Sequence, residues 1–536
     1  MKHKLQSRAL TVLLSVMLII GLMPTTVFAA GTATVQINGQ ILQDGVSVQC
    51  GEGTAVLDKT KGTLTLDNAT INQDGNVPAL RVDNGDLKVI LIDENTITST
   101  TQRPFYNVNV DLTIQGTAED SLTIKTDSDG LQADNSNLTI DGCKIDITST
   151  KFGGMMCWGG TLTIQNGADI TIDSFENALM GDCGLSITDS TVNATARSNY
   201  QDWSTTAISS NGNISITDST VNATANGDAA NAIYGGGTIS INNSEVEATT
   251  TVQNNLYPAL CAGGNIAIIN HSTATVKSAG TIGIWSSGGE VVIQDSIAHV
   301  TAHDEWDAIR GSNGGVTISG SWVETFGSMV SPKYTSSDSA IFLNNEGSVS
   351  GSLTLPGSVT VSEDMQLSIP EDSSITVPNG VTFTNHGQIE LLGELVVNDG
   401  AIACDSHTGG TATCIEKAKC SICGKEYGDL GSHVMKKTEA KKATCTEDGN
   451  TEYYTCEICG KIFSDKNGLV EIQLSDTVIK AKGHSYENGK CTLCGAAEGS
   501  AQTGDDSSII FWAMLAGIAA LGTAGTALYR KRREIK

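Results

Sequence analysis

Cysteine and histidine residues are concentrated in one stretch of the chain, between positions 404 and 494. Nine of the 14 cysteines and three of the eight histidines lie there. Six of these cysteines form three Cys-x-x-Cys-Gly elements, in the pairs Cys420 and Cys423, Cys456 and Cys459, and Cys491 and Cys494. Two thiolates on one tight turn, with glycine next, have the geometry of a zinc knuckle. The stretch is therefore a candidate metal-binding module.

The nine cysteines and three histidines are enough ligands for three four-coordinate Cys₃His sites. From their order along the chain we expect three groups, which are Cys414, Cys420, Cys423 and His433; Cys445, Cys456, Cys459 and His484; and Cys404, His407, Cys491 and Cys494. A full shell of protein ligands leaves no open position for catalysis, so Zn²⁺ would be structural here. Disulfides are the alternative in an exported protein, but an odd number of cysteines with one histidine per repeat favours zinc.

Most of the remaining chain is a repeat of short apolar triplets, each with a central residue that is usually polar. The triplets run from Leu64-Thr65-Leu66 to Val316-Thr317-Ile318, at spacings of 23 to 29 residues. Each unit contains two further short apolar segments, such as Ser190-Thr191-Val192-Asn193-Ala194 and Ala207-Ile208-Ser209. Such a unit cannot bury an apolar face alone, but stacked units can. The sequence therefore predicts an all-β parallel β-helix with three strands per coil, with Leu and Ile inside and Thr, Ser and Lys outside.

Composition changes along the chain divide it into eight segments. Repeat coils fill the central part, a cap protects the open end of the solenoid, and the Cys/His repeats follow. The expected segments are a signal peptide (1–29), an N-terminal cap (30–61), parallel β-helix coils (62–350), narrower terminal coils (351–400), Cys/His-rich zinc-binding repeats (401–498), a linker (499–508), a transmembrane helix (509–529) and a basic cytoplasmic tail (530–536).

Both ends of the chain carry targeting signals. The first residues combine Lys2, Lys4 and Arg8 with an apolar run and a small-residue cleavage site, which is the pattern of a secretory signal peptide. Residues 509–529 are apolar, long enough to cross a bilayer, and followed by basic residues. We therefore expect export. The formal net charge of −27 argues against nucleic acid as a partner.

These features resemble known families. The Leu-Thr-Ile and Ser-Thr-Val-Asn-Ala units, over roughly residues 31–400, resemble the pectate-lyase-like right-handed parallel β-helix, and especially the carbohydrate-binding β-helix domains of Firmicutes cell-wall-anchored surface proteins. Gln502, Thr503 and Gly504 resemble part of a sortase sorting signal, in which Ser500 and Ala501 replace its Leu and Pro. The Cys/His repeats resemble small Cys-rich modules near such anchors, which implies a spacer. The resemblance implies an extracellular protein, anchored to the cell wall or membrane of a Gram-positive-type cell and joined to peptidoglycan.

Aromatic residues in the repeat are candidate sugar ligands. One aligned position holds Tyr234, Cys261, Trp285 and Arg310 on four successive units. Residues at one position of successive coils should lie in register, about 4.8 Å apart. Aromatic rings stack on pyranose faces, although they can equally seal the corners of a solenoid. The expected carbohydrate-binding residues are Tyr234, Tyr257, Trp285, Trp306 and Arg310.

The sequence favours a non-catalytic surface protein that binds polysaccharide, host glycan or extracellular matrix, as adhesins do. A lyase would need a carboxylate cluster for Ca²⁺ and a base beside it, and arginine is scarce in the repeat, so we assign no catalytic residue. Ca²⁺ stays an alternative cofactor. Two other functions stay open, which are a pectate-lyase-like polysaccharide lyase or hydrolase acting on acidic glycans, and a purely structural stalk.

Overall fold

The computed structural model describes residues 33–197, 205–227, 230–253, 256–303, 306–327, 329–330, 334–405 and 407–499. The expected signal peptide, the sorting motif at Gln502, Thr503 and Gly504, and the expected transmembrane helix at 509–529 lie outside these ranges. Within the ranges, no helix is long and apolar enough to cross a membrane. The chain divides into two compact units, with the boundary between His407 and Thr408.

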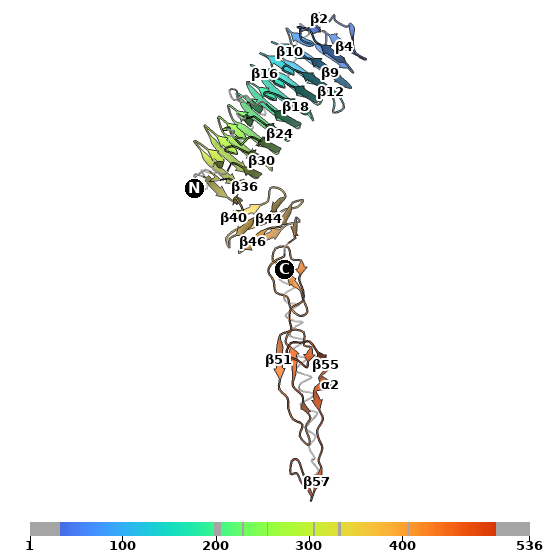
Figure 1. The fold of residues 1–536 in the computed structure, drawn as a ribbon, viewed down its shortest axis with the longest axis vertical. Coiled ribbons are helices and arrows are strands. Elements are labelled where there is room, and N and C mark those ends of the chain that lie inside the picture. Colours follow the sequence, from blue (N-terminus) through green and yellow to red (C-terminus); the bar gives the residue numbers. More distant parts are fainter. Residues whose placement is uncertain are drawn as a thin grey trace. The chain divides into compact units, whose positions relative to one another are not determined.

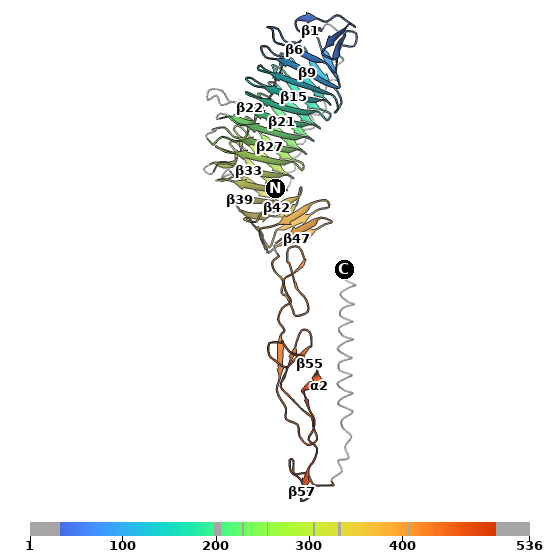
Figure 2. The ribbon, with the colours of Figure 1, turned by 45° about the vertical axis from the view of Figure 1, so that its right-hand side comes forward.

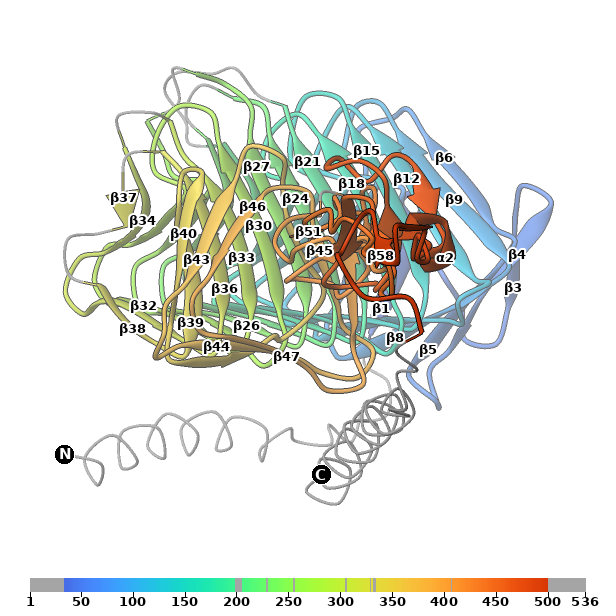
Figure 3. The same ribbon diagram turned by 90° about the horizontal axis from the view of Figure 1, so that it is seen from below.

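The first unit is an all-β parallel solenoid of about 12 turns (Figure 1). Three sheets of 13, 14 and 15 strands, here called sheets A, B and C, run along it. One coil contributes one strand to each, for example β13 (Leu131–Asp134) to sheet A, β14 (Leu138–Asp141) to sheet B and β15 (Lys144–Ser149) to sheet C. The predicted parallel β-helix with three strands per coil is confirmed. Figure 2 and Figure 3 show the stacked coils from two other directions.

Sheet A carries the aligned residues Tyr234, Cys261, Trp285 and Arg310. Its strands follow one another in chain order, except that β1 and β2 pair antiparallel at its beginning. They are β2 (Gln40–Ile41), β1 (Thr34–Ile37), β7 (Leu80–Asp83), β10 (Phe105–Val108), β13, β16 (Met155–Trp158), β19 (Leu179–Gly181), β22 (Thr205–Ser210), β25 (Ala230–Gly235), β28 (Leu260–Ala262), β31 (Ile284–Ser286), β34 (Asp307–Gly311) and β37 (Met329–Val330).

The core is a single column of aliphatic side chains inside the stack. In β14, Leu138 and Ile140 are fully buried while Thr139 is partly exposed, which is the alternation expected of a pleated strand. Leu138 pairs with the corresponding leucine of the coil on either side, so residues of one type stack on one another. The column therefore grows by one set of inward side chains for each coil.

The two ends of the solenoid differ from its middle. At the beginning, β3 (Ser47–Cys50), β4 (Gly53–Asp58) and β5 (Thr63–Asp67) pair antiparallel before the parallel coils start. Near the other end, β39 (Ser339–Leu343) and β40 (Glu346–Ser350) form an antiparallel hairpin. Short coils then continue in sheet C and in two three-stranded sheets.

In the second unit, short antiparallel strands surround the Cys/His repeats. One small helix, α2 (Leu474–Thr477), is the single α-helix among the described residues. The strands are β49 (Ala418–Lys419), β50 (Glu426–Tyr427), β51 (Met435–Thr438), β52 (Gly449–Asn450), β53 (Tyr453–Cys456), β54 (Ile462–Phe463), β55 (Glu471–Ile472), β56 (Val478–Ile479), β57 (Tyr486–Glu487) and β58 (Lys490–Cys491).

A ladder of buried serines stabilises the corner between sheets B and C over seven coils. The residue before each serine has a φ between 47° and 63°, a conformation that Asn, Asp and Gly adopt most readily. The N–H of each of the first six serines donates to the Oγ of the serine in the next coil at 3.1 to 3.2 Å, and the Oγ of all seven donates to a carbonyl of its own corner. The serines are Ser190, Ser219, Ser244, Ser272, Ser296, Ser321 and Ser339.

Replacement of a central serine of this ladder should destabilise the solenoid. In Ser272→Ala the N–H of Ser244 loses its acceptor in a buried position, which costs about 1–3 kcal/mol. Urea denaturation of the solenoid measures this loss. Ser240→Ala, on the partly exposed outer side of β26 (Ile239–Asn242), is the control and should change the free energy of unfolding by less than about 0.5 kcal/mol. Equal effects of the two substitutions would contradict the role of the ladder.

Candidate functional site

The three Cys-x-x-Cys-Gly turns share one backbone geometry. The glycine N–H donates to the carbonyl of the first cysteine at 2.9 Å, in the pairs Gly424 to Cys420, Gly460 to Cys456 and Gly495 to Cys491. The three glycines have φ values of 70°, 73° and 77°, which side chains other than glycine rarely adopt. Antiparallel pairing on both sides of each turn holds its ends together, as between Lys419 and Glu426. This geometry explains why glycine follows each cysteine pair.

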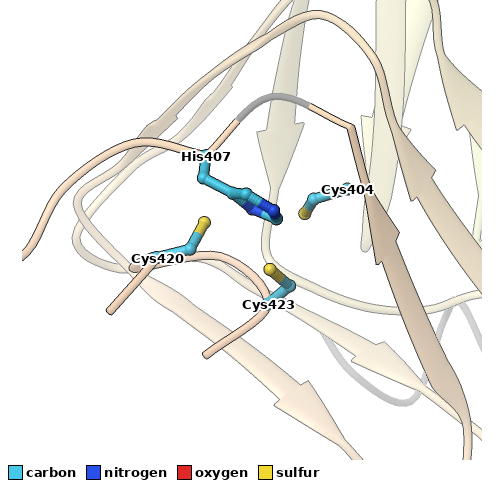
Figure 4. A group of neighbouring side chains, drawn as sticks. All are labelled: Cys404, His407, Cys420 and Cys423. Carbon is cyan, nitrogen blue, oxygen red and sulfur yellow. The ribbon is translucent and has the colours of Figure 1, made fainter. Parts of the chain in front are cut away.

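The structure gathers all twelve expected ligands into three clusters of three cysteines and one histidine. Within each cluster the ligand atoms all lie within 4.8 Å of one another. The first cluster is Cys404, His407, Cys420 and Cys423; the second is Cys414, His433, Cys456 and Cys459; the third is Cys445, His484, Cys491 and Cys494. Figure 4 shows the four side chains of the first cluster around a common centre.

The membership of the clusters corrects the grouping expected from sequence order. Each Cys-x-x-Cys pair joins the nearest histidine before it. The expected groups instead joined the first two pairs to the histidine after each pair, and joined the third pair to the distant His407. The physical reason is that the ligands interleave. Cys445 of the third cluster lies in the sequence between His433 and Cys456 of the second. The recurring Ala-Thr-Cys-x-Glu segments around Cys414 and Cys445 are the sequence signal that marks the first ligand of the second and third clusters.

The spacing of the ligand atoms fits a tetrahedral Cys₃His shell. The Sγ atoms of Cys414 and Cys456 are 3.6 Å apart, and the Sγ of Cys459 is 3.5 Å from the Nδ1 of His433. A tetrahedron with Zn–S distances of about 2.3 Å and a Zn–N distance of about 2.1 Å has edges of about 3.8 and 3.6 Å. The third cluster has the corresponding distances of 3.7 and 3.4 Å. All 14 cysteines lie in the described part of the chain, and none forms a disulfide.

Two of the turns also favour a thiolate at the first cysteine of the pair, at Cys456 and Cys491. His484 and backbone N–H groups of the turn lower the pKa of Cys491 to about 5. Burial acts to raise the pKa of Cys456, but the backbone N–H groups of its turn and His433 outweigh burial, and the pKa is lowered to about 6. Burial and the neighbouring thiols raise the pKa of Cys445 to about 11. Several thiolates at one point repel one another, so a full set of three needs a cation among them.

The aligned aromatic and basic residues form a ladder on the outer face of sheet A. Tyr234 pairs with Cys261, Cys261 with Trp285, and Trp285 with Arg310, on β25, β28, β31 and β34. The register expected from the sequence is confirmed. Tyr234 and Trp285 are half-buried, Cys261 is buried, and Arg310 is exposed. The indole N–H of Trp285 donates to the Oγ of Ser312 at 3.0 Å, which fixes the ring.

Tyr257 and Trp306 lie in the turns that lead into sheet A, before β28 and β34. Both side chains are exposed, at 42% and 41%. The turn that carries Tyr257 is long and joins β27 (Glu245–Thr250) to β28 over residues 251–259, and parts of both turns lie outside the described residues. Loops carried on a rigid scaffold are common places for binding residues. The five expected sugar-binding residues therefore lie on or beside one sheet.

Part of the outer face of sheet A is buried, which was not predicted from the sequence. The ladder of Tyr234 continues toward the N-terminus through Ser209, Met180, Met156 and Gln132. These four outward residues are only 4% to 9% exposed. Outward residues of sheet B in the same coils, such as Thr139, stay partly exposed. The sequence did contain a signal for this burial. The position equivalent to Tyr234 holds polar or unbranched residues in the four preceding coils.

Comparison with protein-family models, with curated protein sequences and with solved structures finds no match. Among the described residues, the three Cys/His clusters are the only groups of three or more His, Cys, Asp or Glu side chains whose ligand atoms converge. The described part of the chain thus offers no carboxylate cluster in support of Ca²⁺.

Proposed function

We propose that this protein is a cell-surface solenoid that binds carbohydrate along the outer face of sheet A. The observation that carries the proposal is the in-register ladder of Tyr234, Trp285 and Arg310, with exposed Tyr257 and Trp306 in the adjoining turns. Aromatic rings offer apolar surface to pyranose faces, and a guanidinium donates hydrogen bonds to hydroxyl groups. Because one coil follows another at about 4.8 Å, the ladder presents these groups in a line that suits an extended glycan chain.

Loss of the two tryptophan rings should remove most of this binding. The variant Trp285→Ala with Trp306→Ala is expected to bind its glycan at least about 30-fold more weakly, since the loss of even one central aromatic contact costs about 2 kcal/mol or more. A glycan array probed with residues 33–499 identifies the ligand, and calorimetry measures the affinity. Tyr334→Ala, an exposed aromatic on sheet B, is the matched control and should bind normally. Unchanged binding in the double variant, or no binding by the unaltered protein, would contradict the proposal.

We further propose that zinc occupies each Cys/His cluster and has a structural role. The support is the match between the measured ligand spacings and a tetrahedral shell, together with three complete sets of four protein ligands. Zinc bound there would make the Cys/His repeats a folded spacer. The proposed location is the outside of a Gram-positive-type cell, with the chain anchored to its wall or membrane, and its support is the sequence of the two termini.

A further inference from the structure

The three Cys/His clusters differ in how well their ligands are shielded from solvent. In the first and second clusters every ligand is buried or partly buried. In the third cluster Cys445 and Cys491 are buried, but Cys494 and His484 are exposed. Oxidants react fastest with cysteine sulfur atoms that they can reach. The third cluster therefore offers the most accessible sulfur atom of the three.

The apolar residue before the second cysteine of each Cys-x-x-Cys turn shows the same trend. Its side chain is 6% exposed at Ile422, 40% exposed at Ile458 and 60% exposed at Leu493. An apolar shell around a metal site limits the access of water and polar solutes to the ligands. The first turn has this cover, and the third turn has the least of it.

The packing of the histidine ligands also separates the second cluster from the third. The ring of His433 lies 4.6 Å from that of Phe463, which is 3% exposed. The ring of His484 lies 5.6 Å from that of Tyr486, which is 37% exposed. A buried aromatic ring thus covers one side of His433, whereas His484 and its aromatic neighbour both face solvent.

The strands that carry the ligands give the third cluster the least support. Cys404 ends β48 (Ala401–Cys404) in a three-stranded sheet, and Cys456 ends β53 in a four-stranded sheet. Cys491 ends β58, which pairs with β57 in a two-stranded sheet. Local opening costs less where fewer backbone hydrogen bonds have to break. The ligands of the third cluster should therefore separate most easily.

A hydroperoxide can convert two thiolates of this cluster into a disulfide. The thiolate of Cys494 attacks one peroxide oxygen, so that an S–O bond forms, the O–O bond breaks and hydroxide leaves. The thiolate of Cys491 then attacks the Sγ of Cys494, so that the S–S bond forms, the S–O bond breaks and a second hydroxide leaves. The two sulfur atoms lose two electrons, and the peroxide becomes two water molecules after each hydroxide takes a proton from solvent. These sulfur atoms lie within 4.8 Å of one another.

We propose that the third cluster is an oxidant-sensitive zinc site, which releases its metal when hydroperoxide joins Cys491 to Cys494. The inference rests on the proposed zinc sites and adds that the three are unequal. Cys445 and His484 are the two ligands left after oxidation, and two protein ligands do not make a structural zinc site. A thiol reductant with Zn²⁺ reverses the change. The other two clusters keep their ligands, so only the last repeat loosens.

Stepwise addition of hydrogen peroxide to the zinc-loaded protein tests this inference. Native mass spectrometry should show the zinc count fall from three to two, and peptide mapping should find the first disulfide between Cys491 and Cys494. We expect the first ion to leave at least about tenfold faster than the second. Cys494→Ser should hold two ions and keep both at the dose that empties the third site. Cys459→Ser, the equivalent change in the second cluster, is the matched control and should lose one of its two ions at the unaltered rate.

The outcomes separate this inference from the proposed zinc sites. Release of all three ions together, or release from the first or second cluster before the third, would overturn the inference and leave the zinc sites in place. A first disulfide that includes Cys445, or loss of an ion from Cys494→Ser at that dose, would also overturn it. Absence of zinc from the unaltered protein would overturn both.

Discussion

Treatment with a strong chelator is expected to unfold the Cys/His module, residues 408–499, and to leave the solenoid folded. Apart from ligand cysteines, few apolar side chains of this module are buried, namely Ala418, Ile422, Ala443 and Phe463. So small a core does not fold a chain of this length, and small domains of this kind depend on metals or disulfides. Structural zinc contributes about 10–16 kcal/mol in zinc-finger peptides at pH 7. Metal loss therefore removes most of the stability of the module.

Limited trypsin digestion with mass mapping measures this effect, since lysines are frequent between positions 417 and 490. Chelation should expose these lysines to cleavage, and added Zn²⁺ should restore protection. Native mass spectrometry should count three zinc ions per chain. A mass lower by two hydrogens for each pair of cysteines, with no metal, would show disulfides in their place and contradict zinc.

A cysteine substitution within the module tests the observed grouping of ligands. Cys456→Ser should lose one zinc ion and expose residues 433–459, because Cys456 belongs with His433 and Cys414. Cys183→Ser, at an exposed cysteine of the solenoid, is the control and should keep three ions and full protection. Exposure that reached His484 but spared His433 would instead match the grouping expected from sequence order.

The coil repeat and its register could be predicted because each depends on the alternation of apolar and polar residues within a few positions of the sequence. Leu138 and Ile140 alternate with Thr139, and a strand period of two leaves one choice of inward face. The ladder from Tyr234 to Arg310 could be predicted by aligning equivalent positions of successive units, because each residue of one parallel coil pairs with the equivalent residue of the next coil. The twelve residues of the three Cys/His clusters could likewise be named from residue type and spacing.

The grouping of the ligands and the burial of Gln132 depend on the path of the chain in space. Short hairpins bring Cys414 to Cys456 past the intervening Cys420 and Cys423, and sequence order does not record such a path. Gln132 lies on the outer face of its strand, yet it is buried. Turns such as the one at Gly153 press against outward side chains beside it, and alternation along a single strand cannot reveal them.

The wide coils of the solenoid are followed by short coils. Trp322 is the residue whose loss should most destabilise the junction between them. It lies at the start of β36 (Trp322–Phe326), is fully buried, and its ring centroid is 5.0 Å from that of Phe342 and 6.2 Å from that of Phe383. Its indole N–H donates to Oε1 of Glu324 at 2.7 Å, while Oε2 of Glu324 lies 2.7 Å from Nδ1 of His299. Trp322 does not belong to the inner column, because its neighbour Val323 points inward; its side chain fills the contact between the outer face of sheet C and the short coils, and it holds a buried carboxylate.

Trp322→Ala is expected to lower the free energy of unfolding by about 3–5 kcal/mol, because a large cavity forms and Glu324 loses a donor in a buried site. In a solenoid each coil contacts only its neighbours, so the loss should concentrate in the short coils after β39. Hydrogen exchange should therefore rise over residues 339–404 and stay unchanged over residues 33–197. Trp322→Phe, which keeps an aromatic ring but no N–H, is the matched variant and should lose roughly half as much. Uniform exchange along the whole solenoid would show instead that the stack unfolds as one cooperative unit.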